Sequence, residues 1–173
     1  GRYGLGCTEP VVDLKAVMAH VRSAVDEVYR SESPETLRAD GIDVLLGRAR
    51  FRDAHTLEVG DDDARLEARR FLVATGARPL IPPVPGLDAV GYLTYETIWH
   101  LEELPKRLIV VGGGPIGCEL AQALCRLGAG VTLLEAAPRI LLRDEPDASD
   151  LLQRRLTQDG VGLRLGAAVE RVW

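Results

Sequence analysis

The chain has 173 residues, of which 46% are hydrophobic and 27% charged, and its formal net charge at pH 7 is −5. This length suits one large domain or two small ones with a sizeable core, and the acidic balance argues against a nucleic acid or an anionic membrane as partner. No apolar run approaches the roughly 20 residues of a membrane span, and the N-terminus has no signal-peptide pattern.

The cysteines are Cys7, Cys118 and Cys125. An odd, low count indicates a reducing compartment and predicts a cytoplasmic protein. Cys118 and Cys125 fall two turns apart on one predicted helix, roughly 10 Å, which is too far for an unstrained disulfide. We expect buried thiols. The histidines and cysteines are too scattered along the chain for a zinc site, so no metal is predicted.

The first half of the chain predicts two helices and then strands. Asp13 is a plausible N-cap for a helix through Arg30, and Ser33-Pro34 predicts the start of a short helix that ends near Gly41. Residues 42–75 predict a strand-rich unit, with a hairpin around the solvated "GDDD" turn at residues 60–63.

A proline-rich segment divides the chain. "ARPLIPPVPG", residues 77–86, has four prolines in ten residues and cannot form a regular element. It predicts a stiff linker, with a domain boundary that separates residues 1–85 from 86–173. A short helix is expected over residues 95–104, stopped by Pro105.

Strands and helices then alternate. The pattern predicts strands over residues 107–111, 130–135 and 161–165, with helices over 115–127 and 147–158. Alternation at these lengths implies right-handed crossovers and a parallel sheet. The predicted fold class is α/β: a partial Rossmann-like, doubly wound sheet preceded by a small piece that combines helix and β-structure.

The loop after the first of these strands has the spacing Gly112-x-Gly114-x-x-Gly117. The first glycine allows a tight turn, the second lets backbone approach a pyrophosphate, and the third allows close helix–strand packing. Pro115 and Ile116 open the helix, whose free N–H groups and dipole favour phosphate. We expect all five residues to contact a dinucleotide; the alternative is a plain glycine-rich turn.

The next strand ends in an acid, Glu135. A carboxylate at this position would hydrogen-bond the adenosine ribose and repel a 2′-phosphate. Two alanines follow it, and the first arginine beyond is Arg139. The sequence therefore favours NAD over NADP.

Two long stretches resemble a known family. "RRFLVATGARPLIPPVPG" and "ETIWHLEELPKRLIVVGGGPIGCELAQALCRLGAGVTLLEAAPRIL" are similar to the flavin-dependent class I pyridine nucleotide–disulfide oxidoreductases, in particular the mercuric reductase and dihydrolipoamide dehydrogenase branch. The resemblance implies that residues 1–85 are part of an FAD-binding domain and residues 86–173 part of an NAD(P)-binding domain. It also implies a homodimeric parent enzyme.

The resemblance assigns further residues. Ala74, Thr75 and Gly76 would lie against FAD, whereas the pattern alone indicates a buried strand that ends in a turn. Glu119 lies on a helix whose neighbours Ile116, Leu120 and Leu124 are expected to pack on the sheet. In the family a glutamate here pairs with a lysine near the flavin, which makes Glu119 the catalytic candidate. No matching lysine is present, and a solvated acid is the alternative.

Other parts of the family pattern are missing. Nothing before Gly112 forms a second strand–GxGxxG–helix unit, and no two cysteines have the redox spacing C-x-x-x-x-C. The simplest hypothesis is an internal fragment of an enzyme that passes hydride from NADH to FAD and on to a disulfide or metal-ion substrate. The alternatives are a non-catalytic NAD-binding module and a dihydrolipoamide dehydrogenase-type parent. A methyltransferase on the same fold is disfavoured by the proline linker and the ATG segment.

Overall fold

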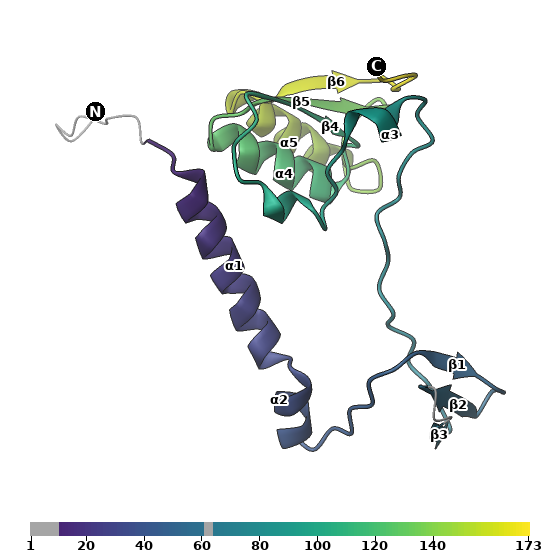
Figure 1. Ribbon diagram of the computed structural model, residues 1–173. Coiled ribbons are helices and arrows are strands. Elements are labelled where there is room, and N and C mark those ends of the chain that lie inside the picture. Colours follow the sequence, from purple (N-terminus) through teal and green to yellow (C-terminus); the bar gives the residue numbers. More distant parts are fainter. Residues whose placement is uncertain (1–10, 61–63) are drawn as a thin grey trace. The chain divides into compact units, whose positions relative to one another are not determined.

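The computed structural model describes residues 11–60 and 64–173, so Cys7 and the turn at residues 61–63 lie outside the described residues. The chain forms two compact units (Figure 1): one holds residues 11–21 with Pro79–Trp173, and the other holds Arg22–Arg78. The break falls at the start of the proline-rich segment. Residues 77–84 have no regular structure there, because proline fixes φ and lacks an N–H donor.

Both N-terminal helices begin at the caps that the sequence predicts. Helix α1 spans Leu14–Ser31, and Asp13 Oδ1 accepts a hydrogen bond from the Ala16 N–H at 3.2 Å. Helix α2 spans Pro34–Ala39, and the Ser33 hydroxyl accepts from the Thr36 N–H at 3.2 Å. These side-chain acceptors satisfy first-turn donors that have no intrahelical partner.

Three short strands of the Arg22–Arg78 unit form an antiparallel sheet in the order β1-β2-β3. They are β1 Ala49–Phe51, β2 Thr56–Val59 and β3 Ala64–Glu67. β2 and β3 form the predicted hairpin. The ring of Phe51 meets that of Phe71 edge-on, with centroids 5.2 Å apart. This geometry is favourable for aromatic pairs.

The prediction of strand over residues 42–75 is wrong at both ends. Residues 42–46 and 68–76 have no strand structure. Leu46 and Leu72 are 75% and 94% exposed. A strand is stabilised by a hydrogen-bonded neighbour, and within residues 11–60 and 64–173 no strand pairs with either segment.

The larger unit contains the predicted parallel sheet, in the order β4-β5-β6. Its elements are β4 Arg107–Val111, α4 Pro115–Arg126, β5 Gly130–Glu135, α5 Pro146–Gln158 and β6 Gly162–Leu165. Val110 pairs with Leu133, and Leu133 with Leu163. The predicted alternation is confirmed, with boundaries within one residue of those expected.

The core of this unit lies between the sheet and helices α4 and α5, which Figure 1 shows on one side of the sheet. Leu133 of β5, Ala121 of α4 and Leu156 of α5 are completely buried. Burial of each large aliphatic side chain stabilises the fold by about 1.5–3 kcal/mol. Among the residues that the structure describes, no helix has the length and apolar character needed to span a membrane.

The predicted helix over residues 95–104 is wrong in extent. A short helix α3 occupies Leu87–Val90, and only a 3-10 turn, η1, forms at Ile98–His100. The Thr97 hydroxyl accepts from the Thr94 N–H at 2.9 Å, and Trp99 Nε1 donates to the Tyr95 carbonyl at 2.6 Å. Side chains that bond locally to the backbone compete with a regular helix.

Candidate functional site

The glycine loop connects β4 to α4, and its first and last glycines touch. Gly112 has φ of +110°, which favours glycine, and its N–H donates to the Leu134 carbonyl at 2.8 Å. A Cβ on Gly117 would collide with the Gly112 carbonyl oxygen. Gly117 therefore permits the close helix–strand packing that the spacing predicts.

Gly114 is different, because nothing lies within 4 Å of the position that its Cβ would occupy. It is the N-cap of α4, with extended backbone at φ −74°, and Pro115 follows as the first helical residue. The loop therefore exposes bare backbone beside the positive end of a helix. A phosphate can approach backbone amides closely at such a place.

The structure brings Glu135 to this loop. Its Oε2 accepts from the Gly113 N–H at 2.6 Å, and its Oε1 accepts from the Ala137 N–H at 2.7 Å. The carboxylate is half-buried and fixed at both oxygens. Each oxygen keeps an acceptor site for a further donor such as a ribose hydroxyl.

The loop after β5 supports the glycine loop from the other side. The Leu141 N–H donates to the Gly113 carbonyl at 2.8 Å. The buried Cys118 thiol donates to the same carbonyl at 3.6 Å. Burial, and then the charges of Glu135 and Glu119, raise the pKa of the Cys118 thiol to about 11, so it remains protonated as a donor at neutral pH.

The role of Leu141 is not predictable from the sequence, because no local pattern indicates it. Leu141 looks like an ordinary core residue in the sequence, yet it is the one described non-glycine residue with positive φ, at 49°. Its contact with Gly113 joins positions far apart in the chain. Only the sheet register determines that pairing.

Glu119 lies on α4 and is exposed. It lines a cavity of about 270 Å³ with Cys118, Gln122, Leu141 and Asp144 among its neighbours. Over residues 11–60 and 64–173 it makes no ion pair within 4.0 Å. Its exposure is compatible with a solvated acid, and a pairing role for Glu119 stays a prediction.

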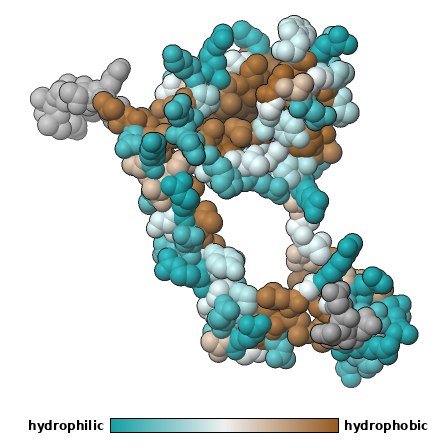
Figure 2. Space-filling view, viewed as in Figure 1, coloured by the Kyte–Doolittle hydropathy of each residue, from teal (hydrophilic) through white to brown (hydrophobic). Residues whose placement is uncertain are grey.

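Ile116 lies outside the core, although the sequence predicts that it packs on the sheet. Leu124 is buried and Leu120 half-buried, but Ile116 is 48% exposed. It lines a groove of about 1650 Å³ that runs from the glycine loop along the outer face of β4. Ile109 and Val111 of β4 are exposed on this face at 65% and 57%. Figure 2 shows the apolar surface of this unit. An exposed Ile116 is available for contact with a bound molecule.

The ATG segment lies in the other unit. Ala74, Thr75 and Gly76 are exposed and have no regular structure, so the alternative of a buried strand is wrong. Gly76 has φ of +70°. Exposed backbone in this segment is compatible with contacts to a ligand, which stay a prediction.

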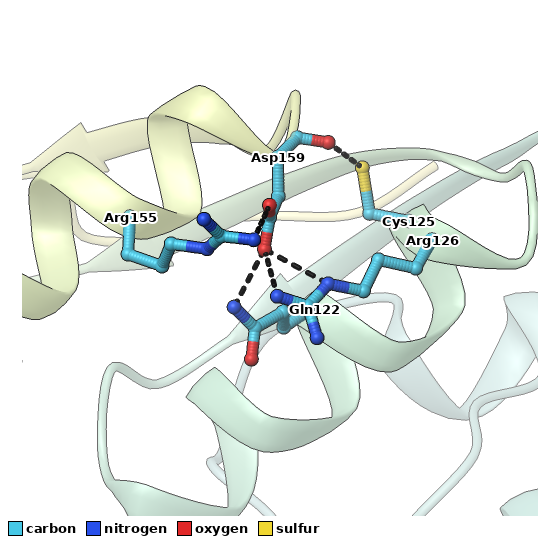
Figure 3. A network of polar contacts seen from close by, with 5 residues as sticks. All are labelled: Gln122, Cys125, Arg126, Arg155 and Asp159. Carbon is cyan, nitrogen blue, oxygen red and sulfur yellow. Dashed lines mark hydrogen bonds and ion pairs between the residues drawn. The ribbon is translucent and has the colours of Figure 1, made fainter. Parts of the chain in front are cut away.

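The far ends of the two helices behind the site are joined by polar contacts (Figure 3). Asp159, just after α5, accepts from Gln122 Nε2 at 2.6 Å and pairs with Arg126 at 2.6 Å and with Arg155 at 2.9 Å. The Cys125 thiol donates to the Asp159 carbonyl at 3.2 Å. These contacts fix the spacing of α4 and α5, which carry the loops of the site.

The chain is similar to known proteins along most of its length. The family described as pyridine nucleotide-disulphide oxidoreductase matches residues 8–173. A mercuric reductase of Lysinibacillus sphaericus is 37% identical over 169 residues, which cover 98% of this chain and 31% of the relative. A mercuric reductase of Streptomyces lividans is also 37% identical, over 91% of this chain and 34% of the relative.

A solved structure agrees with these sequence matches. The Cu(II) complex of the HOCl-induced flavoprotein disulfide reductase RclA from Escherichia coli superimposes with a TM-score of 0.76 at 31% identity. The match covers 93% of this chain and 37% of that protein. The chain thus spans about a third of the length of the proteins it matches.

Proposed function

Because the chain belongs to the pyridine nucleotide-disulphide oxidoreductase family, we propose that its Pro79–Trp173 part binds the adenosine and pyrophosphate half of NAD(H) in an FAD-dependent oxidoreductase. The observation that carries this proposal is the Glu135 carboxylate, held beside the glycine loop by the Gly113 N–H at 2.6 Å. The end of β5 and the glycine loop, which leads into α4, meet at this carboxylate.

The pyrophosphate is assigned to the start of α4. Gly114 leaves open space above the backbone, and the first N–H groups of a helix have no intrahelical acceptor. Pro115 removes only one of those donors. Ile116 lines the adjoining groove. Together these residues supply backbone donors, a dipole and an apolar wall.

The adenosine ribose is assigned to Glu135. Two neighbouring hydroxyls can each donate to a carboxylate oxygen, and the negative charge repels a 2′-phosphate. We therefore propose NAD(H) over NADP(H). A bound nicotinamide dinucleotide would supply the hydride, and FAD the route to the final acceptor.

The assignments that go beyond the nucleotide loop are proposed for a longer enzyme of which this chain would be a part. Residues 1–85 would belong to an FAD-binding domain, with backbone of Ala74, Thr75 and Gly76 against the flavin, and residues 86–173 to the NAD-binding domain. The substrate would be a disulfide or a metal ion, in a homodimeric cytoplasmic enzyme. Glu119 would act only if a lysine from another part of such an enzyme reaches it.

The proposal is tested by binding. Glu135→Ala should weaken NADH binding by roughly tenfold or more, because two charge-assisted hydrogen bonds are lost. Binding of reduced nicotinamide mononucleotide, which has no adenosine, should change little. Glu102→Ala, which removes an exposed acid from the same unit, is the matched control for charge. Titration calorimetry measures all three proteins.

Equal weakening of both ligands in Glu135→Ala would reject the ribose assignment. The oxidoreductase assignment is tested separately, with a longer polypeptide that carries this chain. Flavin absorbance and NADH oxidation are expected there. NADH binding with neither of them would instead favour the non-catalytic module.

A further inference from the structure

Leu141 has an unusual backbone conformation beside the glycine loop. Its φ of 49° lies in the left-handed region, which is sterically unfavourable for a residue that carries a Cβ atom. Such a conformation persists only where surrounding contacts hold it. The side chain is half-buried and packs against the core, so the residue is fixed from one side by packing.

The Asp144 N–H donates to the Leu141 carbonyl at 2.9 Å, and the buried Ser149 hydroxyl donates to the Ile140 carbonyl at 2.7 Å. Arg139 adds a side chain that contacts several carbonyls of the same segment. Its Nη1 donates to the Leu141 carbonyl, and its Nη2 donates to the carbonyls of Leu142 and Asp144, all at 2.9 Å. The planar guanidinium thus ties together three carbonyls of one tight loop. A lysine ammonium group, which is compact and has its donors on one atom, would fit three fixed carbonyl oxygens less well than the guanidinium does.

The restrained loop in turn holds the nucleotide loop. The Leu141 N–H donates to the Gly113 carbonyl at 2.8 Å, and the Gly113 N–H donates to Glu135 Oε2 at 2.6 Å. The carbonyl of Gly113 is therefore held by Leu141, and its N–H is held by Glu135. A chain of contacts runs from Arg139 through Leu141 and Gly113 to Glu135.

We infer that Arg139 is a positioning residue for the dinucleotide site: through Leu141 and Gly113 it holds the Glu135 carboxylate in the orientation that receives the adenosine ribose. This inference rests on the proposed function. It also assigns the first arginine after Glu135 to the protein's own carbonyls rather than to a 2′-phosphate. Its guanidinium thus supports selection of NAD(H) by supporting Glu135.

The test uses Arg139→Met, which keeps the length of the side chain and removes its donors. Arg143→Met is the matched control. Arg143 is exposed in the same loop and makes none of these contacts, so its substitution removes the same charge without disturbing them. Arg139→Lys serves as a second variant should Arg139→Met fail to fold. It keeps the charge and part of the hydrogen bonding, so the same effects are expected at smaller size.

Amide hydrogen exchange is the first measurement and needs no ligand. In Arg139→Met the Gly113 and Leu141 amides should exchange at least about tenfold faster, because their acceptors are no longer held. The Leu133 amide in the sheet should exchange as in the unsubstituted protein. Arg143→Met should leave all three rates unchanged. Unchanged exchange at Gly113 in Arg139→Met would overturn the inference.

The second measurement is a double-mutant cycle on NADH affinity. Arg139→Met should weaken NADH binding roughly five- to tenfold in the unsubstituted protein and less than about twofold in a Glu135→Ala background. A purely structural contribution would instead be additive. Additive losses, or a loss confined to NADPH, would overturn the inference. Absence of any NADH binding would reject the proposed function, while the exchange rates still decide whether Arg139 holds Gly113.

Discussion

The glycines of the nucleotide loop differ in the reason each one is needed. Gly112 is required for its backbone, with φ of +110°. Gly117 is required for packing, since a Cβ would meet the Gly112 carbonyl oxygen. Gly114 faces open space and has ordinary extended backbone. Neither packing nor a positive φ therefore requires glycine at Gly114, and its place as the N-cap of α4 favours glycine only modestly. The open space is compatible with the proposed approach of a pyrophosphate.

This difference predicts unequal effects of alanine at two positions. Gly117→Ala should lower the free energy of unfolding by about 1–3 kcal/mol through overpacking. Gly114→Ala should cost less, about 0.5–1 kcal/mol, because alanine is a poorer N-cap than glycine. It should nevertheless weaken NADH binding, because the methyl group occupies the approach of the pyrophosphate. Urea unfolding and NADH titration measure the two effects. Unchanged NADH binding in Gly114→Ala would contradict the assignment of the pyrophosphate to this position.

At the scale of elements, α4 and α5 are held together by Asp159 (Figure 3). Desolvation raises the pKa of this carboxyl, but hydrogen bonds from Gln122 and Arg126 and the charges of Arg126 and Arg155 outweigh it, so the pKa lies below the ordinary value of 3.8. The folded state therefore binds the proton of Asp159 less readily than the unfolded state does. The charged form stabilises the pair of helices.

The contribution of Asp159 to stability depends on pH. Stability from Asp159 is fully present above pH values near 3.8 and is lost as the pH falls through the lower pKa of the folded state. Asp159→Asn should be less stable at pH 7 and should lose less stability on acidification. Asp150→Asn, which lies in α5 but outside these contacts, should show the same dependence of stability on pH as the unsubstituted protein. Urea unfolding at pH 7, 5, 4 and 3 provides the comparison.

At the scale of the whole molecule, the two units differ in how much core they contain. The Pro79–Trp173 unit holds the main cluster of buried residues. In the described part of Arg22–Arg78, Val59 is the one buried hydrophobic residue, and Leu72 and Val73 are 94% and 63% exposed. Little buried apolar surface means that little free energy opposes local opening of this unit.

Limited proteolysis should reveal this difference. Trypsin should cleave after Arg69 and Arg70, which are exposed and outside any regular element, at least about tenfold faster than after Arg126, which ends α4 and pairs with Asp159. In urea the sites should be cleaved at similar rates. Mass spectrometry of timed samples identifies the cuts. Equal rates in native buffer would show that the unit around Arg70 is as well protected as the sheet.

Much of the fold could be predicted because its signals are local. Helix caps at Asp13 and Ser33, the strand over 107–111 and the glycine spacing all depend on residues within a few positions of one another. The same local logic failed at residues 42–46, 68–75 and 95–104, where apolar or helix-compatible segments lack a partner strand or bond to themselves. Pattern alone does not say whether a partner exists.

The alternating α/β unit, the glycine loop and the candidate acid Glu135 can all be predicted from local patterns. The contact of Glu135 with Gly113, the positive φ of Leu141 and the contacts of Arg139 with carbonyls of its own loop become visible only in the folded chain. Glu135 and Leu141 lie more than 20 residues from the glycine that they contact, so no short pattern predicts these contacts. Register between parallel strands brings the two loops together, and long-range register is set by the packing of the whole unit rather than by any short pattern.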